Sequence, residues 1–219
     1  MKNKTYSIKT KALKTNRNAH LAVNILKNNR KIFSKDLSCV TIMEIMLTDE
    51  YYKMDDIFPD CTKIETFSFS EYDTSKLTTA LDMFNMCFKL VALDLSNFDT
   101  SNITMMAGMF CGCKSLASLN LSNFDTSKVL SMNGMFNQCE KFTSLDLSSF
   151  DTSNVIDMKY MFYKCENLAS IKGIIDMKTC IDYSKMFQGC TRLSGVKIKN
   201  PPTGFDGAGL KPEQYEIVD

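Results

Sequence analysis

The sequence predicts an α/β solenoid of about six 26-residue coils, with a parallel β-sheet on one face and short helices on the other. Two observations predict this fold class. Residues 93–170 contain three in-register copies of one segment, and a fixed period between about 20 and 50 residues is typical of stacked repeats. Within each copy the spacing of apolar residues changes from two to three or four. Each copy is therefore expected to contain a strand and then a helix.

The strand is predicted from the first residues of each copy. Leu145 and Leu147 are apolar, whereas Ser144, Asp146 and Ser148 are polar. Alternation with a period of two indicates a short strand with one buried face. One coil cannot bury its own apolar face, but a neighbouring coil can cover it, and stacked strands then run parallel about 4.8 Å apart.

The helix is predicted from the second half of each copy. The sequence Phe-Asp-Thr-Ser supplies side chains that can accept hydrogen bonds from the first turn of a helix. Val155, Met158, Met161 and Cys165 then follow at spacings of three and four, which is typical of one helix face. The methionines are predicted to fill the core, and a crossover between parallel strands is expected to be right-handed.

Degenerate copies extend the repeat on both sides, and three regions follow from this. Residues 1–40 are expected to form a basic leader and an N-terminal capping helix near 18–30. Residues 41–199 are expected to form the solenoid, which includes a first strand near 40–47. Residues 200–219 are rich in Pro and Gly at their start and are expected to form a C-terminal loop or cap.

The string L-x-L-S-x-F-D-T-S-x-V-x-x-M-x-x-M-F-x-x-C-x-x-L resembles the BspA-like leucine-rich repeats of bacterial surface proteins. The resemblance covers about two thirds of the chain and recurs in register. It implies a leucine-rich-repeat solenoid and an adhesin-like, non-enzymatic role in binding host, matrix or other bacterial proteins. It also implies a secreted or cell-surface location, although no secretory signal is visible in this chain.

Six of the nine cysteines occupy the same position in successive coils: Cys61, Cys87, Cys113, Cys139, Cys165 and Cys190. A column of identical residues indicates packing, because a free cysteine behaves as a small buried apolar residue. Disulfide bridging between coils and metal binding are the alternatives. C-x-x-C spacing, which would favour a metal site, is absent from the sequence.

A second column contains one aspartate and one threonine per coil: Asp73, Asp99, Asp125 and Asp151, each followed by Thr74, Thr100, Thr126 and Thr152. We expect each carboxylate to accept N–H groups of its own turn, as capping residues do. Calcium binding by the aspartate column is the alternative. The glycine-rich turns of calcium-binding β-helices are missing, which favours capping.

Charge is distributed unevenly along the chain. Residues 1–35 contain ten Lys or Arg and no Asp or Glu, whereas residues 36–219 have 16 basic and 25 acidic residues, a net charge of −9. The favoured interpretation is a solvated leader with a capping helix. The alternative is an intracellular or host-delivered repeat protein whose basic leader contacts anionic membrane or nucleic acid.

Function is expected on the exposed face of the sheet, because the extended faces of solenoids are binding surfaces. The outward-pointing positions give a partner-binding set: Asp94, Ser96, Asn120, Ser122, Asp146, Ser148 and Lys172. A merely solvated sheet face is the alternative. The chain has one histidine, His20, and no glycine-rich phosphate loop, so we expect no enzyme, no cofactor, no metal and no small-molecule substrate. We expect a monomer.

Overall fold

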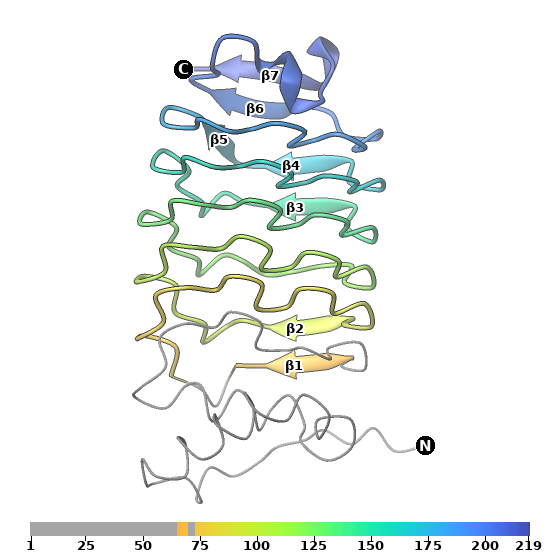
Figure 1. Ribbon diagram of the computed structural model, residues 1–219. Coiled ribbons are helices and arrows are strands. Elements are labelled where there is room, and N and C mark those ends of the chain that lie inside the picture. The colour runs from red at the N-terminus through yellow and green to blue at the C-terminus, as the bar shows by residue number, and fades with distance from the viewer. Residues whose placement is uncertain (1–64, 70–72) are drawn as a thin grey trace, which may run out of the picture.

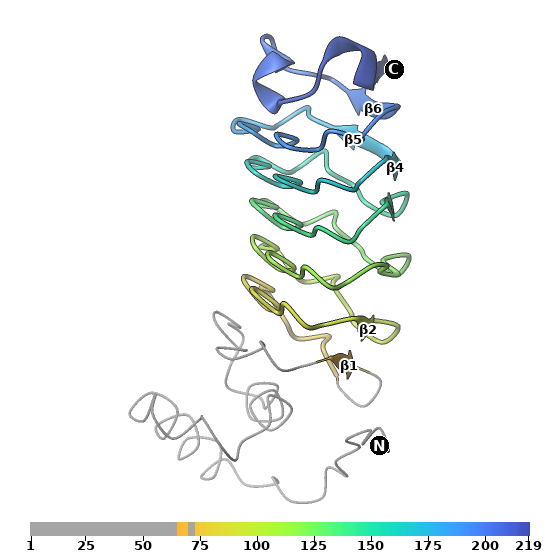
Figure 2. The same ribbon diagram turned by 90° about the vertical axis from the view of Figure 1, so that its right-hand side faces the viewer.

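The computed structural model describes residues 65–69 and 73–219. The expected leader, the capping helix and the first strand near 40–47 lie outside this range. Successive repeats lie one above another in the described part, with their strands on one side and the chain returning along the other (Figures 1 and 2). The result is a β-rich repeat fold.

The strands of the described residues are short, and their pairs are all parallel. The strands are β1 (Thr66–Ser68), β2 (Ala92–Asp94), β3 (Ser144–Asp146), β4 (Ser170–Lys172), β5 (Ile174–Asp176), β6 (Val196–Lys199) and β7 (Tyr215–Val218). They form sheets in the orders β1-β2, β3-β4 and β5-β6-β7. Leu145 pairs with Ile171, one repeat later. The pairing therefore follows the sequence period.

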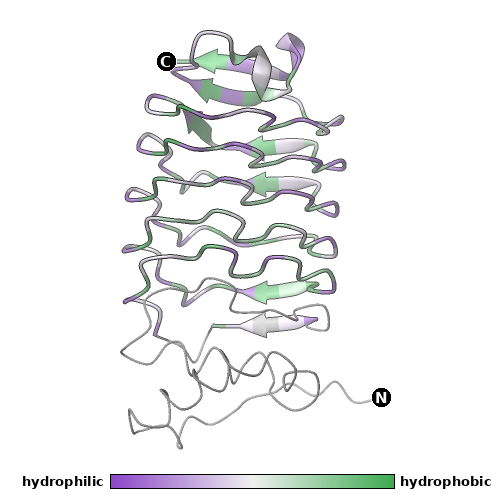
Figure 3. Cartoon of the chain, in the orientation of Figure 1, coloured by the Kyte–Doolittle hydropathy of each residue, from purple (hydrophilic) through white to green (hydrophobic). Residues whose placement is uncertain are grey.

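The alternation predicted for the strands is present. In β3, Leu145 is buried between the exposed residues Ser144 and Asp146. Val196 and Ile198 of β6 are buried, whereas Lys197 between them is exposed, an alternation that Figure 3 shows as hydrophobic and hydrophilic bands. Because side chains of a strand point to opposite faces in turn, one face of each strand joins the core.

The predicted helices are wrong: the described residues contain no α-helix, and the only helical turns there are the 3₁₀ segments η3 (Phe205–Ala208) and η4 (Pro212–Gln214). The segment expected to be helical in each repeat makes a series of tight turns instead. The α/β class is therefore corrected to a β-rich fold. The aspartates that were predicted to cap helices precede turns instead.

The hydrogen bonds show why this segment is not a helix. The N–H groups of Gly108, Phe110 and Gly112 donate to carbonyls of the next repeat, at 2.7–2.9 Å. The N–H groups between them, such as that of Cys111, donate to carbonyls three residues back. An α-helix would need every N–H to bond four residues back. Alternating bonds within and between repeats replace that pattern.

Backbone conformation agrees with the hydrogen bonds. Two positions per repeat have positive φ, four residues apart, for example Gly108 (63°) and Gly112 (73°). A left-handed residue interrupts a right-handed helix, and glycine adopts it at little cost. Apolar spacings of three and four arise here from consecutive turns, which bury the same residues as a helix face would.

The core consists of columns that repeat from coil to coil. Phe84, Phe110, Phe136, Phe162 and Phe187 are stacked, with ring centroids 5.3–5.8 Å apart. The predicted burial of the methionines is confirmed, since Met158 and its equivalents are 0–1% exposed. Phe98, Phe124 and Phe150 form a second column near the strands. Stacked aromatic rings add to the stabilisation that burial itself supplies.

The cysteine column is buried, and the seven cysteines of the described residues are free thiols. In this column the thiols of Cys113, Cys139, Cys165 and Cys190 each donate to the carbonyl of a phenylalanine one repeat earlier, at 2.9–3.2 Å. The packing interpretation is confirmed for these residues, whereas Cys61 lies outside the described range. Burial of the thiols also raises the pKa of Cys139.

Residues 200–219 lie against the last repeat at the C-terminal end of the stack (Figure 1). β7 pairs with β6, and the N–H group of Phe187 donates to the carbonyl of Ala208 at 2.7 Å. Phe205 packs between Tyr183 and Tyr215, with ring centroids 5.8 and 5.1 Å apart. This segment therefore covers the last turns of the core.

Candidate functional site

A ladder of polar residues lies at the ends of the strands on the sheet side, and we refer to the seven predicted residues as the sheet-face ladder. All seven are exposed: Asp94, Ser96, Asn120, Ser122, Asp146, Ser148 and Lys172. They come from successive repeats, so the spacing of the coils sets their spacing. The structure brings them onto one surface, as the sequence predicts.

Three ladder residues are held by their own turns. The carboxylate of Asp94 accepts a hydrogen bond from the N–H of Ser96 at 3.0 Å, and Asp146 accepts one from Ser148 at 3.0 Å. Asn120 accepts the equivalent bond from Ser122 at 3.1 Å. A side chain that bonds the backbone two residues later fixes the turn. These groups are therefore preorganised.

Two contacts connect ladder residues to the neighbouring repeat. Lys172 Nζ lies 2.8 Å from Asp146 Oδ2, and the hydroxyl of Ser68 donates to Asp94 Oδ2 at 2.9 Å. The bond from Lys172, followed by those from Ser148, holds the pKa of Asp146 well below its usual range. The pKa of Asp94 is also lowered, first by its bond from the Ser96 N–H. Both carboxylates remain charged at neutral pH.

The second aspartate column lies at the next turn of each repeat. The carboxylates of Asp99, Asp125 and Asp151 accept the N–H of the serine two residues later, at 2.9–3.0 Å. The prediction that each aspartate bonds its own turn is confirmed, although the turn begins no helix. Within the described residues no cluster of three or more His, Cys, Asp or Glu could hold a metal ion.

An apolar column that the sequence reasoning missed lies on the return side of the coils. Leu130, Ile156 and Ile181 are 45%, 44% and 81% exposed, and each donates its N–H to the carbonyl one repeat earlier, at 2.8–2.9 Å. The sequence does carry a signal for this column, because each of its residues directly follows a buried residue: Val129, Val155 and Cys180. Aromatic and basic side chains of the same coils, near Tyr160 and Tyr163, were missed as well.

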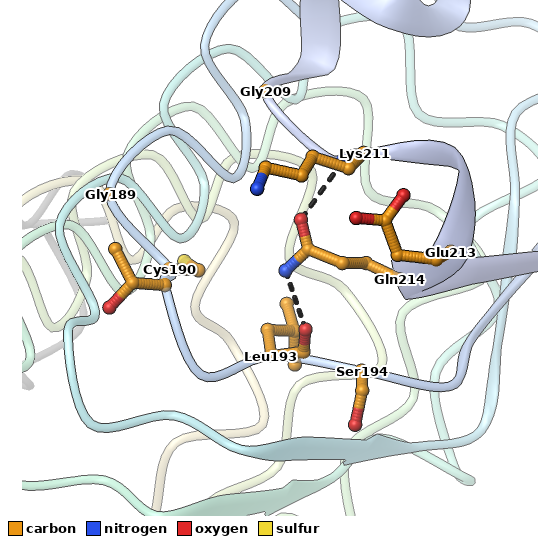
Figure 4. A pocket seen from close by; sticks show the side chains of 9 residues that line it. Gly189, Cys190, Leu193, Ser194, Gly209, Lys211, Glu213 and Gln214 are labelled. Atoms are coloured by element: carbon orange, nitrogen blue, oxygen red, sulfur yellow. Dashed lines mark hydrogen bonds between the residues drawn. The ribbon is translucent and has the colours of Figure 1, made fainter.

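A cavity of about 400 Å³ lies between the last repeat and the C-terminal segment, lined among others by Cys190, Leu193, Lys211 and Gln214. Gln214 spans it: its amide donates to the carbonyl of Leu193 at 2.6 Å and accepts the N–H of Lys211 at 2.9 Å (Figure 4). The polar groups of Gln214 are thus used to join the C-terminal segment to the stack. No helix among the described residues has the length and apolar character needed to span a membrane.

The stacked repeats and their parallel strands define a β-rich repeat protein. The chain belongs to the family described as Mycoplasma protein of unknown function, DUF285, whose model matches residues 10–92 and again residues 82–200. The two matches agree with an internally repeated chain. Comparison with curated proteins and with solved structures gives no significant match.

Proposed function

We propose that this protein is a non-enzymatic, adhesin-like interaction module that binds a macromolecular partner through the sheet-face ladder. We also propose that the repeats form a right-handed leucine-rich-repeat solenoid of the BspA-like type, and that the protein is secreted or lies at the cell surface. A host, matrix or other bacterial protein is the partner class that the sequence resemblance implies.

One observation carries the proposal. The exposed ladder recurs from repeat to repeat, and Asp94, Asn120 and Asp146 are fixed by hydrogen bonds from their own turns. A surface that is rigid before binding loses little conformational entropy when a partner binds, which favours affinity. Such a surface extends over several coils and therefore suits a large partner.

A non-enzymatic role is supported by the chemistry of the acidic residues. Asp94, Asp125, Asp146 and Asp151 hydrogen-bond to the turns that they stabilise, and their pKa values are lowered. General acid or base catalysis near neutral pH needs a group that titrates near that pH. These carboxylates are stable anions with a structural use.

The test places large side chains on the sheet-face ladder while keeping the backbone hydrogen bonds that fix its turns. Ser96→Arg, Ser122→Arg and Ser148→Arg retain the backbone N–H groups that bond Asp94, Asn120 and Asp146. Binding of the full chain to a panel of purified extracellular-matrix proteins is measured by surface plasmon resonance. The triple variant is expected to lose at least tenfold in affinity for a protein that the parent chain binds.

The control variant carries Leu130→Arg and Ile156→Arg on the return side of the coils. It is expected to bind as the parent does. Equal binding by the triple serine variant would refute a role of the ladder, and failure of the parent chain to bind any panel protein would refute the matrix-binding proposal. Deletion of residues 1–35 tests the alternative, in which the basic leader contacts anionic membrane or nucleic acid.

A further inference from the structure

A cluster of two tyrosines and three lysines lies on the turns of two neighbouring repeats, and we call it the aromatic–basic cluster: Lys159, Tyr160, Tyr163, Lys164 and Lys185. The two rings meet edge to face, with centroids 5.3 Å apart and planes at 81°. The ammonium groups of Lys159 and Lys185 lie 5.2 and 5.9 Å from the Tyr160 ring. Lys164 lies 5.4 Å from the Tyr163 ring.

The backbone at this cluster is left-handed, as it is at the same two positions of the other described repeats. Tyr160 and Lys185 have φ of 58° and 57°, in a position where the earlier repeats have Asp82, Gly108 and Gly134. A left-handed conformation costs a non-glycine residue roughly 1–2 kcal/mol, and a bulky side chain there is an outlier. Lys164 has φ of 57° in the second such position, which the other repeats fill with Met86, Gly112, Gln138 and Gly189.

The side chains of the cluster are available to a partner. Tyr160 and Tyr163 are half-buried and lie outside the buried core, while Lys164 and Lys185 are exposed. Each exposed cation–aromatic contact contributes about 0.5–1 kcal/mol, so the three contacts of the cluster offset part of the cost of the backbone conformation. A Cβ placed on Gly134, which is equivalent to Tyr160, would lie 3.7 Å from its nearest neighbouring atom, so this position has room for a side chain.

Charge at the cluster is incompletely balanced. Lys159 lies 3.8 Å from a carboxylate oxygen of Asp182, whose other oxygen accepts hydrogen bonds from Ser184. Within the described part of the chain, Lys164 and Lys185 form no ion pair. The ammonium groups of Lys164 and Lys185 thus lie beside aromatic rings and can bind an anionic group of a partner molecule.

We propose that the aromatic–basic cluster is a second binding surface, which takes an acidic segment of a partner protein. Lys164 and Lys185 pair with its carboxylates, and Tyr160 and Tyr163 contact its aliphatic parts; tyrosine is enriched among residues that dominate binding energy. Single-stranded nucleic acid is the less suitable ligand. Its bases would stack on tyrosine faces that the lysine ammonium groups already occupy. The surface uses no residue of the sheet-face ladder and does not depend on its function.

The test measures binding of a fluorescein-labelled deca-glutamate peptide to the full chain by fluorescence anisotropy at low and at physiological salt. Saturable binding that weakens with salt is expected, because exposed charges are screened. The double variant Y160G/K185G restores the glycine of the earlier repeats. It should bind about fivefold or more weakly, since two exposed charge and ring contacts are lost, while its melting temperature is equal or higher.

Two further variants keep the result decisive. K164Q/K185Q removes two charges without altering glycine content and should also weaken binding about fivefold. K89Q/K141Q removes two exposed lysines elsewhere and should leave binding unchanged. If Y160G/K185G and K164Q/K185Q bind the peptide as tightly as the parent chain does, or if the parent shows no saturable binding at low salt, the proposal is overturned. Tighter binding of a twenty-residue oligothymidylate than of the peptide would also overturn it.

Discussion

The hydroxyl of Thr126 joins its repeat to the next one through both backbone groups of Asp151. It donates to the carbonyl of Asp151 at 2.9 Å and accepts the N–H of Asp151 at 2.8 Å. Thr100 bonds Asp125 in the same way, and Thr152 bonds Asp176. All three threonines are buried. The threonines next to the aspartate column therefore link successive coils.

Thr126→Val removes the hydroxyl with little change of shape. Two buried hydrogen bonds are lost and two backbone groups of Asp151 are left without a partner, so the free energy of unfolding should fall by about 2–4 kcal/mol. Urea denaturation followed by circular dichroism measures the change. Thr104→Val removes only a longer bond of 3.2 Å to the carbonyl of Thr78 and should cost less than about 1 kcal/mol. Equal losses in the two variants would contradict the proposed linkage.

Phe136 lies inside the stacked phenylalanine column and is 0% exposed. Phe136→Ala should lower the free energy of unfolding by about 3–5 kcal/mol, because it leaves a cavity between Phe110 and Phe162. Phe136→Leu keeps more of the volume and should cost less. Thermal melting of both variants checks the order, and a smaller loss for alanine than for leucine would show that the column does not support the core.

Gly173 separates β4 from β5 with φ of 111°, and an added Cβ would lie 2.8 Å from the backbone carbonyl of Leu147. Gly173→Ala should therefore destabilise the protein by more than the roughly 1–2 kcal/mol of backbone strain alone. Gly195 has φ of 65° with no atom within 4 Å of such a Cβ. Gly195→Ala should cost only the strain. The difference in unfolding free energy between the two variants measures the steric part.

Acid should destabilise the fold through the turn aspartates. Hydrogen bonds from Ser127, Ser153 and Ser184 lower the pKa of Asp125, Asp151 and Asp182 below the ordinary value of 3.8. A carboxylate with a lowered pKa in the folded state adds stability above its unfolded pKa, and this stability is lost as pH falls through the folded pKa. The melting temperature should thus be steady down to about pH 5 and fall below about pH 4.

The control for this pH dependence is the variant S127A/S153A/S184A. It keeps the backbone N–H bonds to the carboxylates but lacks the hydroxyl bonds that contribute most to the pKa shifts. Its loss of melting temperature between about pH 5 and pH 3 should be smaller than that of the parent. An identical pH profile would show that these serines are not responsible.

The buried thiols should resist modification in the native protein. Burial, followed by the negative charge of Asp82, raises the pKa of Cys111 to about 11, and burial raises that of Cys139 further. At pH 8 such thiols are protonated and therefore poor nucleophiles. Iodoacetamide labelling with peptide mapping should modify Cys113, Cys139 and Cys165 only after denaturation. Labelling of these three at the same rate with and without denaturant would contradict their burial.

Raised thiol pKa values also predict the alkaline limit of stability. A group whose pKa is raised in the folded state contributes stability below its unfolded pKa, and this is lost as pH rises through the folded value. For Cys111 and Cys180 that window runs from about 9 to about 11. Replacing both by serine should flatten the fall of melting temperature in this window, which thermal scans at successive pH values measure.

The sequence by itself determined the 26-residue register, the columns of buried Phe, Met and Cys, and the exposed ladder from Asp94 to Lys172. These follow from periodicity, because identical residues at a fixed spacing occupy equivalent places in every coil. Only the tertiary structure decided between turns and helix. The N–H groups of Gly108 and Phe110 find their acceptors in the neighbouring repeat, at Asn133 and Met135. Those acceptors exist only once the coils are stacked, so a single repeat, whose apolar residues have helical spacing, could not reveal the choice.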